Sequence, residues 1–176
     1  MSGLRIFISH SAKTKAAQTL LKRLHESLKD EHQVWLDRVN LRPGEPWYHS
    51  INWCIGYCNA AIVLLSEDAL TRNFVFYEVS ILAFRRRTNP DFKLIPICVP
   101  GEVDDDAIKK SRLSPCGISD FQMITGNDND SIINCLHNHL NKITQCNTPL
   151  DRPIEELCEF CIRCLTMILT FNRFDN

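Results

Sequence analysis

A continuous apolar run at residues 60–65 most limits what this chain can fold into. The run reads Ala-Ala-Ile-Val-Leu-Leu and contains no polar position from which a solvent-facing side could be built. Because successive side chains of a strand point to opposite faces, it predicts a central strand buried on both faces. Strands of this kind belong to parallel sheets that carry helices on both sides. The run therefore favours an α/β fold.

The segments around this run alternate between strand-like and helix-like patterns. Short apolar runs predict further strands at residues 4–9, 33–36, 93–99 and 121–125. Helical spacing predicts helices over residues 16–28, 47–58, 74–84 and 131–143. This order predicts a flavodoxin-like three-layer sandwich, with a mostly parallel five-stranded sheet and helices on both faces. Pro96 is expected to place its strand at a sheet edge or a bulge.

Glu78 is the most unusual residue of the predicted helix over residues 74–84, in which Ser80 is the only other non-aromatic polar residue. Side chains three and four residues apart share a helix face, so the neighbours of this acid are apolar: Phe74, Val75, Ile81 and Leu82. Burying an unpaired carboxylate is costly, so such a group usually has a partner or a role at a cleft. The alternative is an exposed carboxylate near the helix start, favoured by the helix dipole.

Polar residues follow the predicted strands at positions where parallel strands end together. Ser9 is the last residue of the first strand and His10 follows it; Asp37 follows the second strand and Ser66 the third. Open parallel sheets bind ligands at the carboxyl ends of their strands, so these residues and Glu78 are expected at one site. The segment from Asp37 to Pro46 combines charge with turn-forming residues and predicts a long functional loop.

These motifs resemble a Toll/interleukin-1 receptor (TIR) domain, particularly the bacterial kind. The first strand ends in Phe-Ile-Ser-His-Ser, and Val-Trp-Leu-Asp leads into a loop containing Leu-Arg-Pro-Gly-Glu-Pro-Trp. The third strand ends in Ile-Val-Leu-Leu-Ser, and the next helix begins with Asn-Phe-Val-Phe-Tyr-Glu. The resemblance spans about residues 4–143, and the motifs occur in the family's order.

The resemblance implies an enzyme that cleaves NAD between nicotinamide and ribose and releases or cyclises ADP-ribose. Glu78 matches the family's catalytic glutamate, whose carboxylate would stabilise an oxocarbenium-like ribose. NAD is then the substrate, and no cofactor is implied. The loop from Asp37 to Pro46, the BB loop of the family, is expected to mediate self-association and to complete the site of a neighbour. Bacterial members typically act in anti-phage defence.

Further substrate contacts are expected near the strand ends. Nicotinamide needs an aromatic or apolar wall, for which the candidates are Phe7, Trp47, Phe74 and Tyr77. Enzymatic relatives often carry tryptophan in place of Phe74, and phenylalanine weakens any cation–π contribution. Contacts to ribose or phosphate are expected from Ser9, His10 and Asp37, and a hydrogen bond near the sugar from Ser66.

Each of these residues also has a purely structural interpretation. Phe7 is favoured as plain core, because one face of its strand must pack on helices. His10 would cap a turn, and Asp37 would end a strand. Trp47 would anchor the start of its helix, and Ser66 would be an ordinary N-cap.

Two other function classes remain open. One is a non-enzymatic TIR scaffold, in which Glu78 is a surface acid and the BB loop only docks partners. The other is a nucleotide-binding receiver that holds NAD without cleaving it. The surroundings of Glu78 discriminate between enzyme and scaffold: a cleft walled by aromatic residues favours the enzyme, and open solvent favours the scaffold.

The composition limits the partners and the compartment. With 20 basic and 21 acidic residues the net charge is −1, so no global field attracts nucleic acid or an anionic membrane. The N-terminus lacks a signal-peptide pattern, and no stretch reaches the roughly 18 apolar residues that span a bilayer. A cytoplasmic location is therefore expected, and the nine cysteines are expected to be reduced.

The length fits one domain, expected over residues 1–146. Residues 147–176 predict a hinge followed by an apolar helix at 154–171, which would connect to a further domain or pack on the core or a partner. This helix contains a Cys-x-x-Cys-x-x-Cys pattern from Cys158 to Cys164, without the fourth cysteine of an iron–sulfur run. Packing thiols are favoured, and no metal site is predicted.

Overall fold

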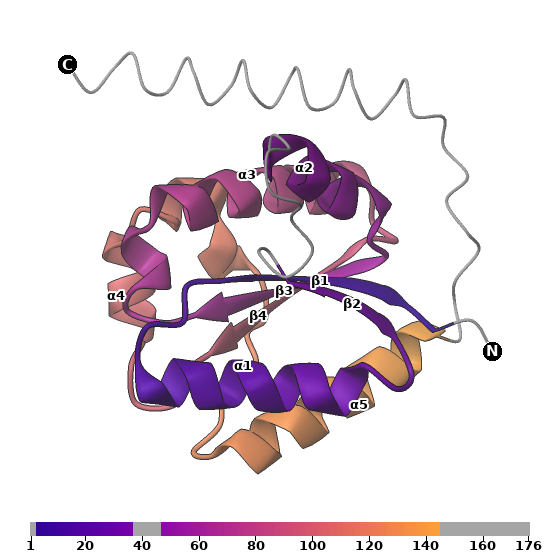
Figure 1. Ribbon diagram of the computed structural model, residues 1–176. Helices are drawn as coiled ribbons and strands as arrows, with labels where there is room; N and C mark the ends of the chain where they lie inside the picture. Colours follow the sequence, from indigo (N-terminus) through magenta and orange to yellow (C-terminus); the bar gives the residue numbers. More distant parts are fainter. Residues whose placement is uncertain (1–2, 37–46, 145–176) are drawn as a thin grey trace.

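The computed structural model describes residues 3–36 and 47–144, and it confirms a flavodoxin-like α/β sandwich (Figure 1). Its strands are β1 (Arg5–His10), β2 (Gln33–Leu36), β3 (Ala60–Leu65) and β4 (Lys93–Cys98). They lie in the order β2-β1-β3-β4, and each pairing is parallel. The BB loop, the predicted hinge, the apolar segment at 154–171 and the domain boundary at residue 146 lie outside the described residues.

β3 is the central strand that its apolar run predicts. It pairs with β1 on one side and β4 on the other, and all six of its residues are buried. Its side chains alternate between two cores, because successive residues of a strand point to opposite faces. Ala61, Val63 and Leu65 pack in one core, and Ala60, Ile62 and Leu64 pack in the other.

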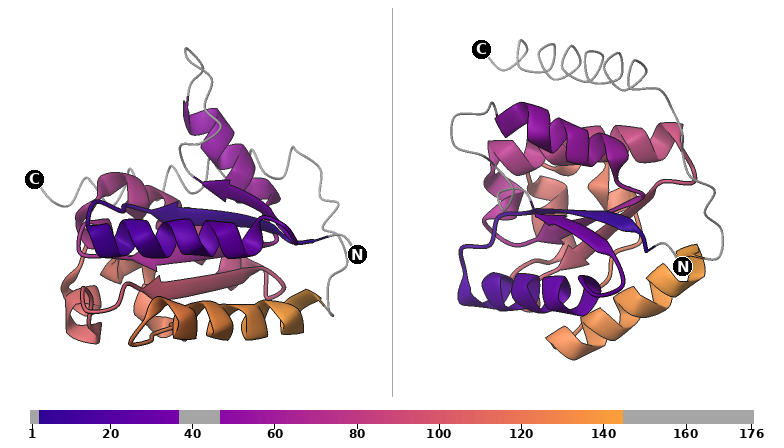
Figure 2. Two further views of the ribbon diagram at one scale, coloured as in Figure 1. Left: turned by 60° about the horizontal axis from the view of Figure 1, so that its bottom comes forward. Right: turned by 45° about the vertical axis from the view of Figure 1, so that its right-hand side comes forward.

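Helices cover both faces of the sheet (Figures 1 and 2). One face carries α1 (Lys15–Leu28) and α5 (Asn129–Thr144), and the other carries α2 (Trp47–Tyr57) and α3 (Asn73–Thr88). Shorter elements lie between them: α4 (Asp105–Lys110) and the 3-10 turns η1 (Ala69–Thr71), η2 (Ser114–Cys116) and η3 (Ile118–Asp120). Within the described ranges, no helix has the length and apolar character that a membrane crossing requires.

The predicted fifth strand at residues 121–125 is reduced to a single bridge, so the described sheet has four strands. Ile124 pairs in parallel with Ile97; its amide donates to the Pro96 carbonyl at 2.9 Å, and its carbonyl accepts from the Cys98 amide at 3.0 Å. The turn η3 ends at Asp120 and α5 begins at Asn129. Residues 121–128 connect them, and Ile124 is the one residue of this connection that bridges to β4.

Pro96 lies in β4 without disturbing its pairing with β3. The Val99 amide donates inward to the Leu65 carbonyl, whereas the Cys98 amide donates outward to Ile124. Backbone N–H groups of a strand alternate in direction, so the nitrogen of Pro96 faces outward like that of Cys98. The missing N–H therefore removes no bond to β3, and β4 forms the edge of the four-stranded ladder, as Pro96 predicts.

Candidate active site

The described residues contain three buried polar side chains, Ser9, Ser66 and Glu78, and all three are predicted site residues. Glu78 lies in the second turn of α3, and its exposed fraction is 0%. The Ser9 hydroxyl, near the end of β1, donates a hydrogen bond to Glu78 Oε2 at 2.5 Å. A buried carboxylate thus meets a buried donor at the carboxyl end of the sheet.

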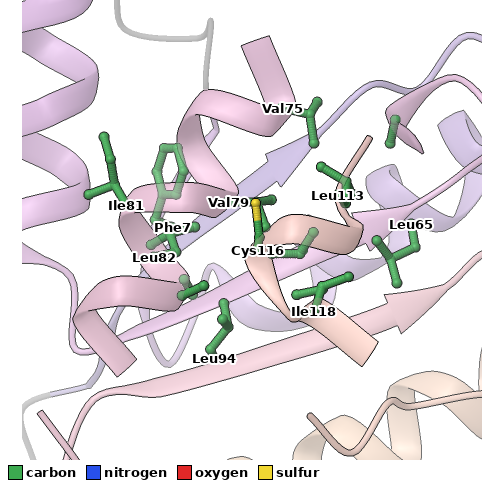
Figure 3. Close-up of a cluster of buried hydrophobic side chains, with 14 of the residues drawn as sticks. Phe7, Leu65, Val75, Val79, Ile81, Leu82, Leu94, Leu113, Cys116 and Ile118 are labelled. Atoms are coloured by element: carbon green, nitrogen blue, oxygen red, sulfur yellow. The ribbon is translucent and has the colours of Figure 1, made fainter. Parts of the chain in front are cut away.

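The alternation of β1 explains why Ser9 meets α3. Ile6 and Ile8 point into the core beneath α1 and α5, whereas Phe7 packs in the core beneath α2 and α3. Ser9 has the same parity as Phe7 and therefore points toward α3. On that helix, Val75 and Val79 belong to the core that also holds Phe7 (Figure 3), and Glu78 lies three residues after Val75.

Ser66 fastens the loop after β1 to the turn after β3. Its hydroxyl donates to the Ser11 carbonyl at 2.7 Å and accepts from the Ala69 amide at 3.2 Å. The second bond is the capping role that its structural interpretation predicts. The first brings two loops together that are 55 residues apart in the sequence. Ser66 therefore lies at the strand ends, where its two hydrogen bonds hold together the loops beside Glu78; we call these linking residues the framework of the site.

Asp68 is a central residue of this framework that sequence reasoning missed. Its carboxylate accepts from the Ser11 hydroxyl, from Lys13 Nζ at 3.1 Å and from Arg72, whose Nε lies 3.1 Å from Oδ2 and whose Nη2 lies 3.1 Å from Oδ1. The spacing of Asp68 and Arg72, four residues apart, is a sequence signal that could have indicated their pairing. The contacts with Ser11 and Lys13 have no local signal.

A cavity of about 640 Å³ opens beside these residues, which is within the range of small-molecule sites. It is lined by residues 10–13, from the end of β1 into the following loop, and by residues 71–75, from the end of η1 into the start of α3. The predicted contacts His10 and Phe74 are therefore brought together at one cavity. Glu78 does not line it and lies one helical turn beyond Phe74.

The remaining predicted contacts lie elsewhere. Phe7 is completely buried in the core, as its structural interpretation predicts. The Tyr77 hydroxyl donates to Asn52 Oδ1 at 2.8 Å, which links α3 to α2. Trp47 begins α2, as predicted, but its side chain lies outside the described part of the chain, as does the whole of Asp37.

The surroundings of Glu78 match neither of the two environments that would discriminate between enzyme and scaffold, a cleft walled by aromatic residues and open solvent. Its complete burial excludes both the surface acid of the scaffold interpretation and the exposed carboxylate near the helix start. It also differs from an acid in an open cleft, because the cavity stops short of it. An acid that is entirely covered contacts a substrate only after neighbouring side chains move.

Four of the described thiols, those of Cys54, Cys58, Cys98 and Cys116, are poorly suited to nucleophilic chemistry. Burial raises the pKa of Cys54 and of Cys98 to about 11. Burial also raises the pKa of Cys58, where Arg85 opposes the rise, and of Cys116, where the Ser80 hydroxyl and Arg87 oppose it. These four residues are free thiols, and their raised pKa keeps them largely protonated near neutral pH. Across residues 3–36 and 47–144, no group of three or more His, Cys, Asp and Glu residues is arranged to hold a metal ion.

Comparison with known proteins identifies the family. A family model described as a TIR domain matches residues 6–133, which is most of the sequence, and this chain therefore belongs to the TIR domain family. None of the curated proteins matches it significantly.

A solved structure is also similar in fold. It is described as the activated Roq1 resistosome directly recognizing the pathogen effector XopQ (TIR domains). The sequence identity is 14% and the TM-score 0.50, over 90% of this chain and 96% of that chain. At this identity the likeness shows a shared fold alone.

Proposed function

We propose that this TIR domain cleaves NAD at the bond between nicotinamide and ribose, with Glu78 as the catalytic residue. The observation that carries the proposal is the completely buried carboxylate, which Ser9 holds one helical turn from a cavity. Burying such a group costs free energy that an apolar residue would not. A functional role is the usual reason for keeping a carboxylate in that position.

The chemistry needs one acid near the sugar. The C–N bond to C1′ of the ribose breaks, and its electron pair leaves with nicotinamide, whose ring thereby becomes neutral. The positive charge that develops on the ribose is stabilised by the Glu78 carboxylate. Water then adds to C1′ and loses a proton, which yields ADP-ribose. Attack by a nitrogen of the adenine instead closes a cyclic product.

Activity on self-assembly would fit the covered position of Glu78. In the described structure no substrate in the cavity reaches this carboxylate, since its exposed fraction is 0%. We expect contacts between TIR domains through the BB loop (residues 37–46) to move the intervening side chains and to complete a neighbour's site. The matched solved structure is described as TIR domains of an activated resistosome, which supports assembly for that protein.

In a cell, such an enzyme would serve as an effector that depletes NAD or as a producer of a nucleotide signal. We expect it in the cytoplasm of a bacterium, where it would take part in anti-phage defence.

A non-enzymatic scaffold is the second candidate, and one observation favours it. Trp53 on α2 is 51% exposed and stacks on Tyr57 with a ring-centroid distance of 4.6 Å. Exposed aromatic residues of this kind are common anchors in protein interfaces. A scaffold would use this surface and would leave NAD intact.

The deciding experiment measures NAD consumption by concentrated or crowded protein, with the products separated by chromatography. Glu78→Gln is compared with the wild type, and Glu67→Gln, which alters an exposed acid in the turn after β3, is the matched control. We expect consumption by the wild type and by Glu67→Gln, and a fall of about 10²–10³-fold in Glu78→Gln. An inactive wild type under assembling conditions would favour the scaffold, and an active Glu78→Gln would exclude a catalytic Glu78.

A further inference from the structure

Two cations from separate loops meet at the cavity. Lys13 belongs to the loop after β1 and Arg72 immediately precedes α3, and both line the cavity. Each forms an ion pair with Asp68: the distance to Oδ1 is 3.1 Å from Lys13 Nζ and 3.1 Å from Arg72 Nη2. Because the two cations share one carboxylate, Asp68 offsets only part of their positive charge.

The positions of the three groups direct this charge outward. The Asp68 side chain is only 17% exposed, whereas those of Lys13 and Arg72 are 63% and 43% exposed. The carboxylate thus lies behind the two cations and also accepts from the Ser11 hydroxyl. Arg72 directs Nε and Nη2 at Asp68, so Nη1 is the nitrogen that remains for a ligand.

The start of α3 adds to the positive potential. Its first residues line the cavity, and the N-cap residue Arg72 makes no side-chain capping bond. The N-terminal end of a helix carries a partial positive charge and directs backbone N–H groups outward. This contribution reinforces the two side chains in the same place.

We propose that Lys13 and Arg72 form an anion subsite for the diphosphate of a nucleotide, with Asp68 as the positioning residue. The assignment rests on the proposed function, because it extends the site of Glu78 to the phosphates of the same substrate. Arginine and lysine are the side chains best suited to phosphate oxygens, and charge-assisted bonds are the stronger ones. The cavity volume of about 640 Å³ accommodates a ligand of nucleotide size.

The spacing along α3 agrees with a nucleotide that extends from the subsite toward Glu78. Glu78 follows Arg72 by six residues, which corresponds to about 9 Å along the helix axis. A ribose joined to a phosphate at the subsite would lie on the Glu78 side of the cavity once the intervening side chains have moved. Lys13 and Arg72 therefore act in binding, and Glu78 acts in the bond cleavage.

The test measures binding by calorimetry, which does not require NAD cleavage. The probes are ADP-ribose, inorganic pyrophosphate and the phosphate-free nucleoside adenosine, each added to the full chain. The variants are Lys13→Ala and Arg72→Ala, with Arg72→Lys in case the alanine variant does not fold. Lys22→Ala is the matched control, because Lys22 is an exposed lysine on α1 paired only with Glu26 in the described structure.

We expect ADP-ribose to bind the wild type and Lys22→Ala equally. Its affinity should fall about tenfold or more in Lys13→Ala and in Arg72→Ala, because each loses a charge-assisted hydrogen bond. Pyrophosphate should respond in the same way, and any adenosine binding should not change. Equal affinities of all variants for ADP-ribose would overturn the subsite. Binding of pyrophosphate with exclusion of ADP-ribose would overturn its assignment to a nucleotide.

These outcomes are separable from the fate of the proposed enzyme. If the wild type consumes no NAD but the variants bind ADP-ribose more weakly than the wild type, the anion subsite is supported and the enzymatic function is not. If the wild type consumes NAD and the variants do so with an unchanged KM, the enzyme stands without the subsite.

Discussion

The two faces of the sheet are covered by helices of different character. On one face, α1 buries a single stripe of residues at helical spacing: Ala17, Leu20, Leu24 and Leu28. None of the three buried polar side chains of the described residues, Ser9, Ser66 and Glu78, lies on α1 or α5. On the other face, α3 is apolar on most sides and buries Glu78 among Val75, Val79 and Leu82. The helix α1 thus follows the simple amphipathic pattern, whereas α3 departs from this pattern because it buries the acid Glu78.

This difference separates stability from function. An apolar stripe contributes burial without any polar group to satisfy. A buried carboxylate costs free energy, and departures of this kind concentrate at functional sites. The cavity, the Asp68 ion pairs and the Ser9–Glu78 hydrogen bond all belong to loops and helices near the carboxyl ends of the strands. The helices α1 and α5 pack on the opposite face of the sheet and contribute to its stability.

The largest effect is expected on the apolar face. Leu24 is fully buried, so Leu24→Ala should lower the free energy of unfolding by about 3 kcal/mol through lost burial and a cavity. Chemical denaturation with urea measures this value. Below the unfolding transition, ADP-ribose affinity should stay unchanged, because Leu24 lies in the core of the opposite face. A specific loss of affinity in folded protein would show that the two faces are coupled.

A smaller effect of opposite sign is expected for the buried acid. Glu78→Gln keeps the shape and an oxygen acceptor for Ser9 and replaces the buried carboxyl group by an amide that carries no charge, so it should raise the free energy of unfolding by about 1 kcal/mol. The same denaturation experiment detects the change, with Glu67→Gln as the exposed control. A clear destabilisation would mean that the carboxylate contributes to stability, and the contrast between the two faces would lose its energetic basis.

The smallest effect is expected from the pH dependence of the α1 and α5 side. Burial lowers the pKa of His32, Glu31 opposes this shift, and His137 on α5 adds to it, so the pKa is lowered on balance. The His32 Nδ1 accepts from the Leu4 amide at 3.2 Å, which also requires a neutral ring nitrogen. The unfolded chain therefore binds the proton more strongly than the folded one. Stability should fall as the pH drops through the unfolded value of 6.5 toward the lower folded pKa.

Thermal unfolding between pH 7.5 and 5 measures this dependence, and His32→Gln should reduce it. His25→Gln is the control for replacing a histidine elsewhere on the same side. A stability profile that is identical in the wild type and His32→Gln would contradict a role for this imidazole.

Much of the fold was predictable because its signals are local. The apolar run of β3, the helical spacing in α1 and the turn at Ser66 each depend on neighbours within a few residues. The fifth strand was overestimated because residues 121–125 have a strand-like pattern, whereas Ile124 alone among them pairs with β4. The identity of Glu78 as an unusual residue was also a local signal.

The sequence by itself determined the α/β sandwich and its central strand, which is buried on both faces. It also determined that the chain belongs to the TIR domain family and that residue 78 is an unusual acid. Only the tertiary structure decided that Ser9 is the donor to Glu78 and that Asp68 joins Ser11, Lys13 and Arg72. The Ser9–Glu78 and Ser11–Asp68 pairs span 69 and 57 residues. Such contacts depend on strand register and on how α3 lies on the sheet, so no window of neighbouring residues specifies them.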